Sequence, residues 1–366
     1  MYVKFNEIEH ILKNILSTPT SPFRENLVIK QITEYLNNLG AEITLTKHNN
    51  LIGKLGRKTG KRNLYFISHM DHPGFLVQEE HSQKVILKVM GGVPVVAKNL
   101  KSIVEIDILT GERFIHPVKR LIKKQKKLYI EVIPTKKVKS ENIFTLHLKD
   151  YIKKDNTIYA HRIDDLGGCA AQICALFFLT KYKRDIDVNL HFVFTRAEEV
   201  GFIGLVSLIK NGYLSRKDYY ISCETSKCIP PIQFGKGVVL RLGDRAGLFE
   251  HQLTNALLNY YQKKILLDKY PIQRALLDGG TCEATPLVVN NYLCSGFACP
   301  LGNYHNLNEK SNTIDEEFID ISDFTSYVNT IIETSLNFSK ILEAYNKNGI
   351  MRRINVNYRK IERYMR

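Results

Sequence analysis

The 366-residue sequence lacks the marks of several large protein classes. No apolar run approaches the ~20 residues that a membrane-spanning helix needs. The seven cysteines form no C-x-x-C pair, and the first residues lack the basic start, apolar centre and cleavage site of a signal peptide. We therefore expect reduced, mostly buried thiols and a cytoplasmic protein with no membrane partner.

Motifs of several enzyme classes are missing as well. The sequence contains no G-x-G-x-x-G dinucleotide fingerprint, no G-x-S-x-G nucleophile elbow and no H-E-x-x-H zinc motif. It also shows no internal repeat and no low-complexity segment. These absences argue against a nucleotide-dependent dehydrogenase, an elbow-type serine hydrolase and a repeat scaffold.

Positive charge is concentrated in two parts of the chain. The formal net charge is +15, of which residues 73–160 and 347–366 together contribute nearly all. Neither segment contains a helix-turn-helix, zinc-finger or aromatic RNA-binding signature, so a nucleic-acid partner is not expected. The basic tail can serve to bind a polyanion or another subunit, and its sequence does not decide between them.

The hydrophobic pattern predicts an α/β fold with an insertion. Helical spacing of apolar residues predicts helices over residues 4–16, 23–39, 167–179, 202–210, 249–261 and 316–338. Short apolar runs predict strands over residues 64–68, 84–89, 102–109, 127–133, 190–195, 219–223 and 293–299. Because strands alternate with helices outside the middle segment, we expect a mainly parallel mixed sheet flanked by helices.

This pattern divides the chain into four parts. Residues 1–72 and 161–345 are expected to form one catalytic domain. Residues 73–160 are expected to form an inserted small β-barrel or sandwich that serves oligomerisation and substrate access. Residues 346–366 are expected to be a loose basic tail.

Acids and histidines follow five predicted strands or the strand–helix junctions between them. They are His69, Asp164, Glu199, Glu224 and His305. Since parallel strands end at one edge of a sheet, these side chains are expected to meet there. Carboxylate and imidazole ligands without thiolates suit a catalytic Zn²⁺, Co²⁺ or Mn²⁺ site. Three carboxylates and two histidines suffice for a two-metal cluster if one carboxylate bridges.

Two further acids stand next to these candidates. Asp71 follows His69 by two residues and can fix the imidazole tautomer. Glu198 and Glu199 are neighbours after a strand, where successive side chains point in different directions. One of the two can therefore bind a metal while the other serves as the general base for an attacking water.

Five segments together resemble a known enzyme family. They are SHMDHPGF (68–75), HRIDDLGG (161–168), TRAEEVGFIG (195–204), GGT (279–281) and NYH (303–305). They resemble, in order, the two-metal aminopeptidase family that includes tetrahedral and glutamyl aminopeptidases, some once labelled endoglucanases. The resemblance implies a zinc-exopeptidase-like catalytic domain, two zinc or cobalt ions per subunit, and dimers that can build dodecamers. It also implies a small β domain at the position of residues 73–160.

The resemblance also implies a role for each candidate ligand. His69 and Glu224 would bind one metal, and Glu199 and His305 would bind the other. Asp164 would bridge the two.

The resemblance implies roles for two further residues, and the sequence departs from the family pattern at three places. Asp71 would orient His69, and Glu198 would be the general base that passes a proton from water to the leaving amine. Glu224 stands where the family usually has Asp, Leu166 where it commonly has Arg, and Cys282-Glu283 alter its Gly-Thr-Asp-Ala stretch. We expect Glu283 to lie near the cleft and to hold a cationic group of the substrate.

The sequence thus predicts an exopeptidase that removes N-terminal residues from peptides. A second interpretation is an N-acyl-amino-acid deacylase or a carboxypeptidase on the same scaffold. A third, of another class, is a non-catalytic metal-binding or assembly protein. In every case a homo-oligomer, from dimer to dodecamer, is the expected state.

Overall fold

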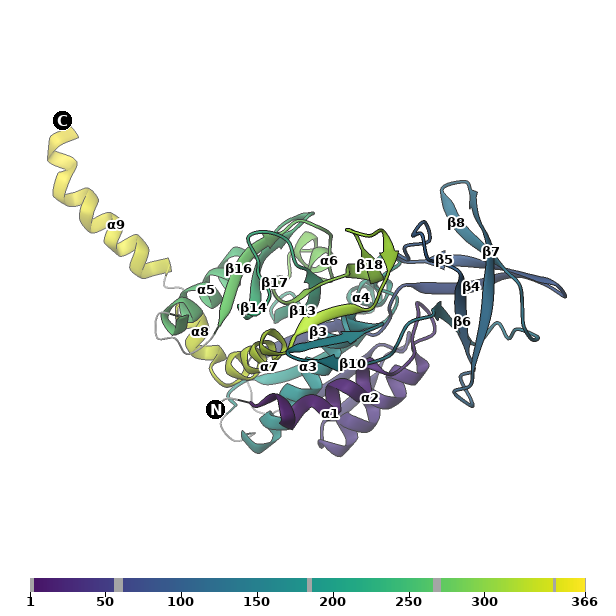
Figure 1. Ribbon diagram of the computed structural model, residues 1–366. Coiled ribbons are helices and arrows are strands. Elements are labelled where there is room, and N and C mark those ends of the chain that lie inside the picture. The colour runs from purple at the N-terminus through teal and green to yellow at the C-terminus, as the bar shows by residue number, and fades with distance from the viewer. Residues whose placement is uncertain (1–2, 56–61, 183–185, 266–270, 345–346, 366) are drawn as a thin grey trace.

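A mixed nine-stranded sheet runs through the larger part of the molecule in the computed structural model (Figure 1), which describes residues 3–55, 62–182, 186–265, 271–344 and 347–365. Its strands are β1 (Glu42–Leu45), β2 (Leu51–Leu55), β3 (Asn63–His69), β12 (Asn189–Thr195), β13 (Tyr219–Lys227), β14 (Val238–Asp244), β15 (Gly247–Leu248), β16 (Ile272–Leu277) and β17 (Leu293–Leu301). Strands β12, β3, β13 and β17 are parallel neighbours, whereas β2 and β14 flank them in antiparallel pairing. The prediction of a mixed sheet with a parallel centre is confirmed.

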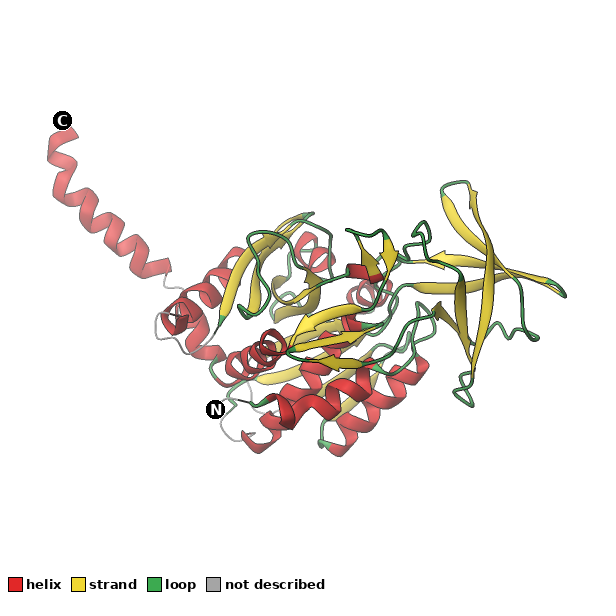
Figure 2. Cartoon of the chain, in the orientation of Figure 1, coloured by secondary structure: helices red, strands yellow, loops and turns green. Residues whose placement is uncertain are grey.

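Helices cover both faces of this sheet (Figure 2). They are α1 (Phe5–Leu16), α2 (Asn26–Asn38), α3 (Ile163–Leu179), α4 (Ile203–Lys210), α5 (His251–Ile265), α6 (Ala284–Val289), α7 (Ile321–Leu336), α8 (Phe338–Ala344) and α9 (Lys347–Ile361), with short 3₁₀ turns η1 (Thr180–Tyr182), η2 (Tyr304–Asn306) and η3 (Glu362–Met365). The α/β fold expected from the sequence is therefore present.

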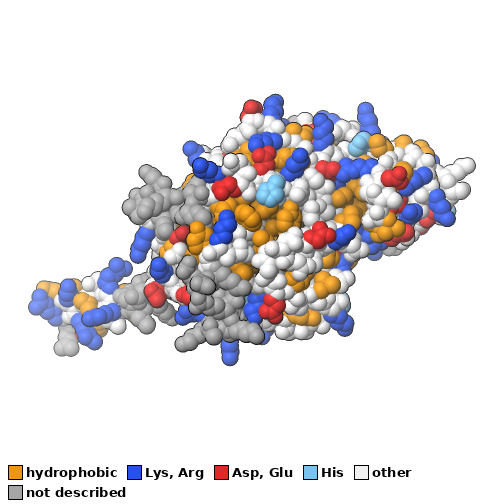
Figure 3. Space-filling model, turned by 90° about the horizontal axis from the view of Figure 1, so that it is seen from below, with side chains coloured by type: hydrophobic (Ala, Val, Ile, Leu, Met, Phe, Trp, Pro, Cys, Tyr) orange, Lys and Arg blue, Asp and Glu red, His pale blue; other side chains and the backbone are white. Residues whose placement is uncertain are grey.

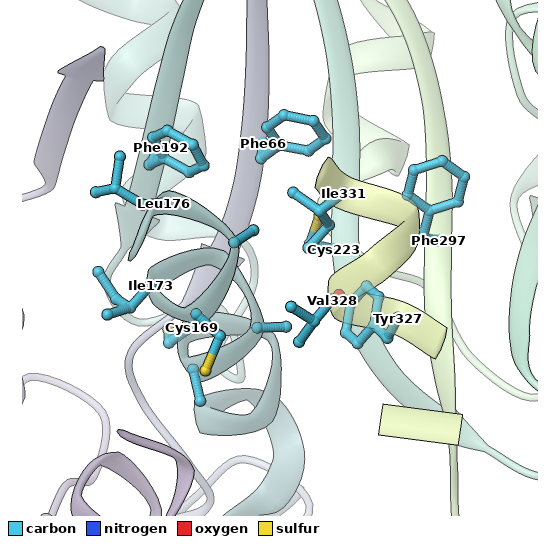
Figure 4. Packing of buried hydrophobic residues seen from close by; sticks show 14 of the residues in the cluster. Phe66, Cys169, Ile173, Leu176, Phe192, Cys223, Phe297, Tyr327, Val328 and Ile331 are labelled. Carbon is cyan, nitrogen blue, oxygen red and sulfur yellow. The ribbon is translucent and has the colours of Figure 1, made fainter. Parts of the chain in front are cut away.

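Successive residues of the central strands face opposite layers. Phe66 of β3 belongs to the large core shared with α3 and α7, as Figure 4 shows. Tyr65 and Ile67 belong to the opposite core, which α4 and α6 close. This alternation explains why the strand sequence is apolar throughout, since both faces are buried. The described part of the chain has one helix long and apolar enough to cross a membrane, Ile163–Tyr182, but 89% of its 18-residue apolar window is buried inside the protein, as in a core helix.

A closed six-stranded barrel is inserted after β3. Its strands are β4 (Gly74–His81), β5 (Lys84–Met90), β6 (Ser102–Ile106), β7 (Arg113–Lys124), β8 (Lys127–Val132) and β9 (Ile143–Leu146). The predicted small β structure is confirmed as a barrel. The next strands, β10 (Ile152–Lys154) and β11 (Thr157–Ala160), pair instead with β20 (Glu317–Asp320) beside the main sheet. The domain limits at residues 72 and 160 stay a prediction.

Two expectations for the C-terminal part are wrong. The helix expected over residues 316–338 is a strand, β20, followed by α7, because the alternating Glu317–Asp320 segment completes the sheet with β11. A hairpin of β18 (Leu307–Asn308) and β19 (Thr313–Ile314) precedes it. The tail expected to be loose forms helix α9 and the turn η3. Its apolar residues recur at helical spacing, which favours a helix over a loose tail.

The start of α7 gives a first testable prediction. The Asp320 carboxylate accepts hydrogen bonds from the Ser322 and Asp323 amides at 2.7 and 3.3 Å, as an N-cap does. Asp320→Ala is expected to lower the free energy of unfolding by about 1 kcal/mol. Urea denaturation followed by circular dichroism measures this, with Glu34→Ala, an exposed position of α2, as the control. Equal values for the two variants would show that the cap contributes nothing.

Candidate metal centre and active site

The predicted ligands meet at the carboxyl edge of the parallel strands. His69 is the last residue of β3, and Glu199 follows the end of β12. Glu224 lies inside β13, which runs on to Lys227 rather than ending before the glutamate as expected. His305 follows β17, and Asp164 lies at the start of α3 with non-helical backbone angles. Four strands and one helix start thus deliver the five side chains to one place.

The two oxygens of Asp164 face the two histidines. Asp164 Oδ1 lies 3.5 Å from His69 Nε2, and Asp164 Oδ2 lies 3.4 Å from His305 Nε2. Glu199 Oε1 is 3.2 Å from the same nitrogen of His305, and Glu224 Oε2 is 4.0 Å from that of His69. The carboxylate of Asp164 therefore stands between a His69–Glu224 pair and a Glu199–His305 pair.

The donor set fits divalent cations. The buried Oε1 atoms of Glu199 and Glu224 have no hydrogen-bond partner in the part of the chain that the structure describes. Ligand atoms of His69, Asp164 and Glu199 lie within 4.8 Å of one another, and so do those of His69, Asp165 and Glu224. Several buried carboxylates this close would repel one another without a cation. The grouping also brings in Asp165, which lies within the HRIDDLGG segment but is not among the five predicted ligands.

The Glu198 carboxylate lies beside this cluster. Its Oε2 is 3.9 Å from His69 Nε2. Burial raises the pKa of Glu198 well above its usual range, and the negative charges of Glu199 and Glu224 raise it further, although His69 opposes them. A carboxylate of raised basicity next to a group of candidate metal ligands is suited to accept a proton.

The Asp71 carboxylate contacts the loop that carries Glu198 and Glu199 more closely than it contacts His69. The Asp71 carboxylate accepts hydrogen bonds from the Glu198 amide at 2.9 Å and the Glu199 amide at 3.2 Å. His69 Nδ1 lies 3.0 Å from the backbone carbonyl of Asp71 and 3.5 Å from its carboxylate. The expected contact to the imidazole is thus made mainly by the backbone. The side chain instead fixes the loop that carries both glutamates.

Two supporting residues escaped the sequence analysis. The buried Glu317 carboxylate accepts hydrogen bonds from the amides of Ile163, Asp164 and His305, at 2.8, 3.0 and 2.9 Å. It therefore ties together two ligand-bearing segments that lie far apart in sequence. His72 contacts the Asp164 carbonyl oxygen, and burial lowers its pKa to about 4. His72 was within a quoted motif, but nothing in the sequence singled out Glu317.

A cavity opens beside the cluster. Glu198, Arg241, Cys282 and Tyr304 are among the residues that line it. Arg241 is 2% exposed and its Nη1 donates to Ser226 Oγ at 3.3 Å, while its Nε has no hydrogen-bond partner among the residues described. Within the described residues no carboxylate forms an ion pair with it. The cavity therefore combines the carboxylate cluster with a fixed positive charge that the sequence analysis did not single out.

The remaining departures from the family pattern lie in different surroundings. Glu283 is fully buried, hydrogen-bonds with Thr195 and is not among the cavity-lining residues. Burial raises its pKa to about 8. The expectation that Glu283 holds a cationic substrate group is therefore wrong. Leu166 packs in the main core and Cys282 lines the cavity.

A protein-family model matches part of the sequence. Residues 125–316 match the family model described as M42 glutamyl aminopeptidase. No curated protein matches the sequence.

Several solved structures share the fold at low identity. An aminopeptidase from Desulfurococcus kamchatkensis is 17% identical with a TM-score of 0.74, over 93% of this chain and 98% of that one. A TET1 peptidase from Pyrococcus horikoshii, described as assembling into a tetrahedron or a large octahedral shell, is 18% identical with a TM-score of 0.72, over 90% and 99%. A Thermotoga maritima structure labelled endoglucanase is 18% identical with a TM-score of 0.67, over 92% and 99%.

Proposed function

The chain belongs to the M42 glutamyl aminopeptidase family, whose model matches more than half of it, and we propose that it is a metal-dependent aminopeptidase that releases N-terminal residues from peptides. One observation carries this proposal. Asp164 presents one oxygen to His69 and the other to His305, each of which has a glutamate beside it. This is the arrangement needed for two cations bridged by one carboxylate.

The metal ligands follow from that geometry. His69 and Glu224 would hold one ion, Glu199 and His305 the other, and Asp164 would bridge them. When bound, two divalent cations polarise the scissile carbonyl and lower the pKa of the attacking water. Zinc or cobalt suits these ligands best, and manganese is also acceptable to them.

The protein's own residues supply the proton transfers. Glu198, whose pKa is raised, accepts the proton of the attacking water and gives it to the nitrogen of the leaving amine. The Asp71 carboxylate holds the amides of Glu198 and Glu199, so the base keeps its place relative to the ligands. Burial of the cluster strengthens each of these electrostatic interactions.

Arg241 indicates which substrate side chain the cavity binds. Its guanidinium lines the cavity, is buried and has no carboxylate partner among the described residues. The negative charges of Glu224 and Asp244 already act on the guanidinium, but neither carboxylate forms a direct ion pair with it, so an acidic substrate group can form that pair. We infer a preference for peptides that begin with Glu or Asp.

That preference is tested by comparing two substrates in one preparation. For Arg241→Gln, the kcat/KM ratio of an N-terminal Glu peptide to an N-terminal Leu peptide is expected to fall about 10- to 100-fold, because a charge-assisted hydrogen bond is lost. Lys227, which pairs with Glu309 at 2.6 Å at the rim, gives the control variant Lys227→Gln. The ratio does not depend on the fraction of active enzyme. An unchanged ratio, or an equal fall in both variants, contradicts the role of Arg241.

The same arginine also supports a second candidate function. A carboxypeptidase or an N-acyl-amino-acid deacylase needs a cation for the free α-carboxylate of its substrate, and Arg241 can bind one. Matched peptides with free or acetylated N-termini separate these possibilities when incubated with the metal-loaded protein. An aminopeptidase releases residues only from the free peptides. Cleavage of the acetylated peptides would favour the second candidate, and their products would identify which one.

We also expect a homo-oligomer in solution. The support is the family itself and the assemblies described for similar structures, including a dodecamer. Light scattering coupled to size-exclusion chromatography measures the mass. A monomer would contradict the expectation.

A further inference from the structure

The C-terminal helix projects from the molecule at the end opposite the barrel (Figure 1). Every side chain from Met351 to Met365 is exposed except the half-buried Glu362. Seven basic residues and one acid lie in residues 347–366. This segment therefore combines helical structure, high positive charge and apolar side chains that the described body does not cover.

Most of the apolar and basic side chains lie on opposite faces of the helix, and Val356, which is 43% exposed, is an apolar residue on the basic side. Apolar residues recur at intervals of three and four along one face: Met351, Ile354, Tyr358, Ile361 and Met365. Ile354 is 51% exposed and Ile361 is 56% exposed. The basic residues occupy the other side: Arg352, Arg353, Arg359, Lys360 and Arg363. Figure 3 shows both basic and hydrophobic side chains on the projecting segment. The helix is amphipathic as well as basic.

Two possible binding partners fit this helix less well than an anionic lipid surface does. A second copy of the helix would bring a like net charge against it, and two heptads are shorter than the three or four that a coiled coil needs. Nucleic acid would neutralise the basic face but would leave the apolar face without a role. An anionic lipid surface engages both faces at once, because the charges meet the headgroups while the apolar residues enter the interface.

We propose that α9 is a peripheral membrane-binding helix that lies on an anionic lipid bilayer and tethers the protein there. This replaces the expectation of no membrane partner, which rested on the lack of a spanning segment. It concerns the tail alone and does not depend on the activity of the metal centre.

The test uses the full chain and vesicles that contain phosphatidylglycerol, with phosphatidylcholine vesicles for comparison. Co-sedimentation is expected with the anionic vesicles only. Arg353→Gln combined with Lys360→Gln should weaken the partition roughly 30-fold. Ile354→Asn combined with Ile361→Asn should weaken it at least about 10-fold at unchanged charge. The matched control, Lys123→Gln with Lys124→Gln on exposed positions of β7, should bind like the wild type.

Three results would overturn the proposal. One is equal binding to both kinds of vesicle, or equal losses in the control and the Arg353–Lys360 variant. Another is that the wild type does not bind vesicles and the Ile354–Ile361 variant has a lower oligomeric mass. That result would make α9 a subunit interface. The third is binding of a labelled DNA duplex in preference to vesicles, lost in the charge variant but kept in the apolar one.

Discussion

Glu198→Gln is expected to lower kcat by about 100- to 10,000-fold while the metal content stays unchanged. The amide has the shape of the carboxylate but cannot accept the proton of the attacking water. Glu198 is not among the five proposed ligands, so its loss should not release metal. Hydrolysis of a peptide with a free N-terminus and elemental analysis of the same preparation measure the two quantities.

The neighbouring residue provides the contrast for this prediction. Glu199 Oε1 faces His305 at 3.2 Å, so Glu199→Gln should lose metal together with activity. Glu34→Gln, on an exposed position of α2, should change neither. If Glu198→Gln keeps more than about a tenth of the activity, or loses metal as Glu199→Gln does, the assignment of the base is wrong.

Asp164→Asn is expected to weaken both metal sites at once. Its two carboxylate oxygens face His69 and His305, at 3.5 and 3.4 Å, and an amide offers only one oxygen. The metal content should fall from about two ions per chain to less than one, and most of the activity should be lost with it. Asp218→Asn, at the residue just before β13, serves as the matched control.

Thermal unfolding gives an independent measure of the same change. Metal at a thousandfold excess over Kd stabilises a one-site protein by roughly 4 kcal/mol, so loading should raise the Tm of the wild type clearly. This rise should vanish for Asp164→Asn and remain for Asp218→Asn. A variant that still binds two ions and keeps its metal-dependent rise would show that Asp164 does not bridge.

The sequence predicts the body of the fold well because its signals are local. Strands such as β3 are uninterrupted apolar runs, and the helix that starts near Asp164 is marked by small and apolar residues. Helix α7 was expected to start too early because Phe318 and Ile321, three residues apart, continue the helical spacing of the apolar residues that follow, whereas the alternating burial of Glu317 and Ile319 is that of a strand. Only the pairing of β20 with β11, more than 150 residues away, makes this segment a strand.

The candidate site was predictable to the same degree. The five proposed ligands lie at or near strand ends or at a helix start, which a sequence reveals. Glu317 and Arg241 do not, since their importance arises from contacts to Asp164, His305 and the cavity that form only in the folded chain. Glu283 shows the opposite error, because its charge suggested a substrate contact and its burial removes it from the cavity.

The most direct test of the proposed function is a metal titration of the chelated protein. Release of the N-terminal residue from an unblocked peptide is followed as zinc or cobalt is added in known equivalents. We predict no release by the metal-free protein and full activity only when about two ions are bound per chain. Release without metal, or saturation of both sites without any release, would contradict the account.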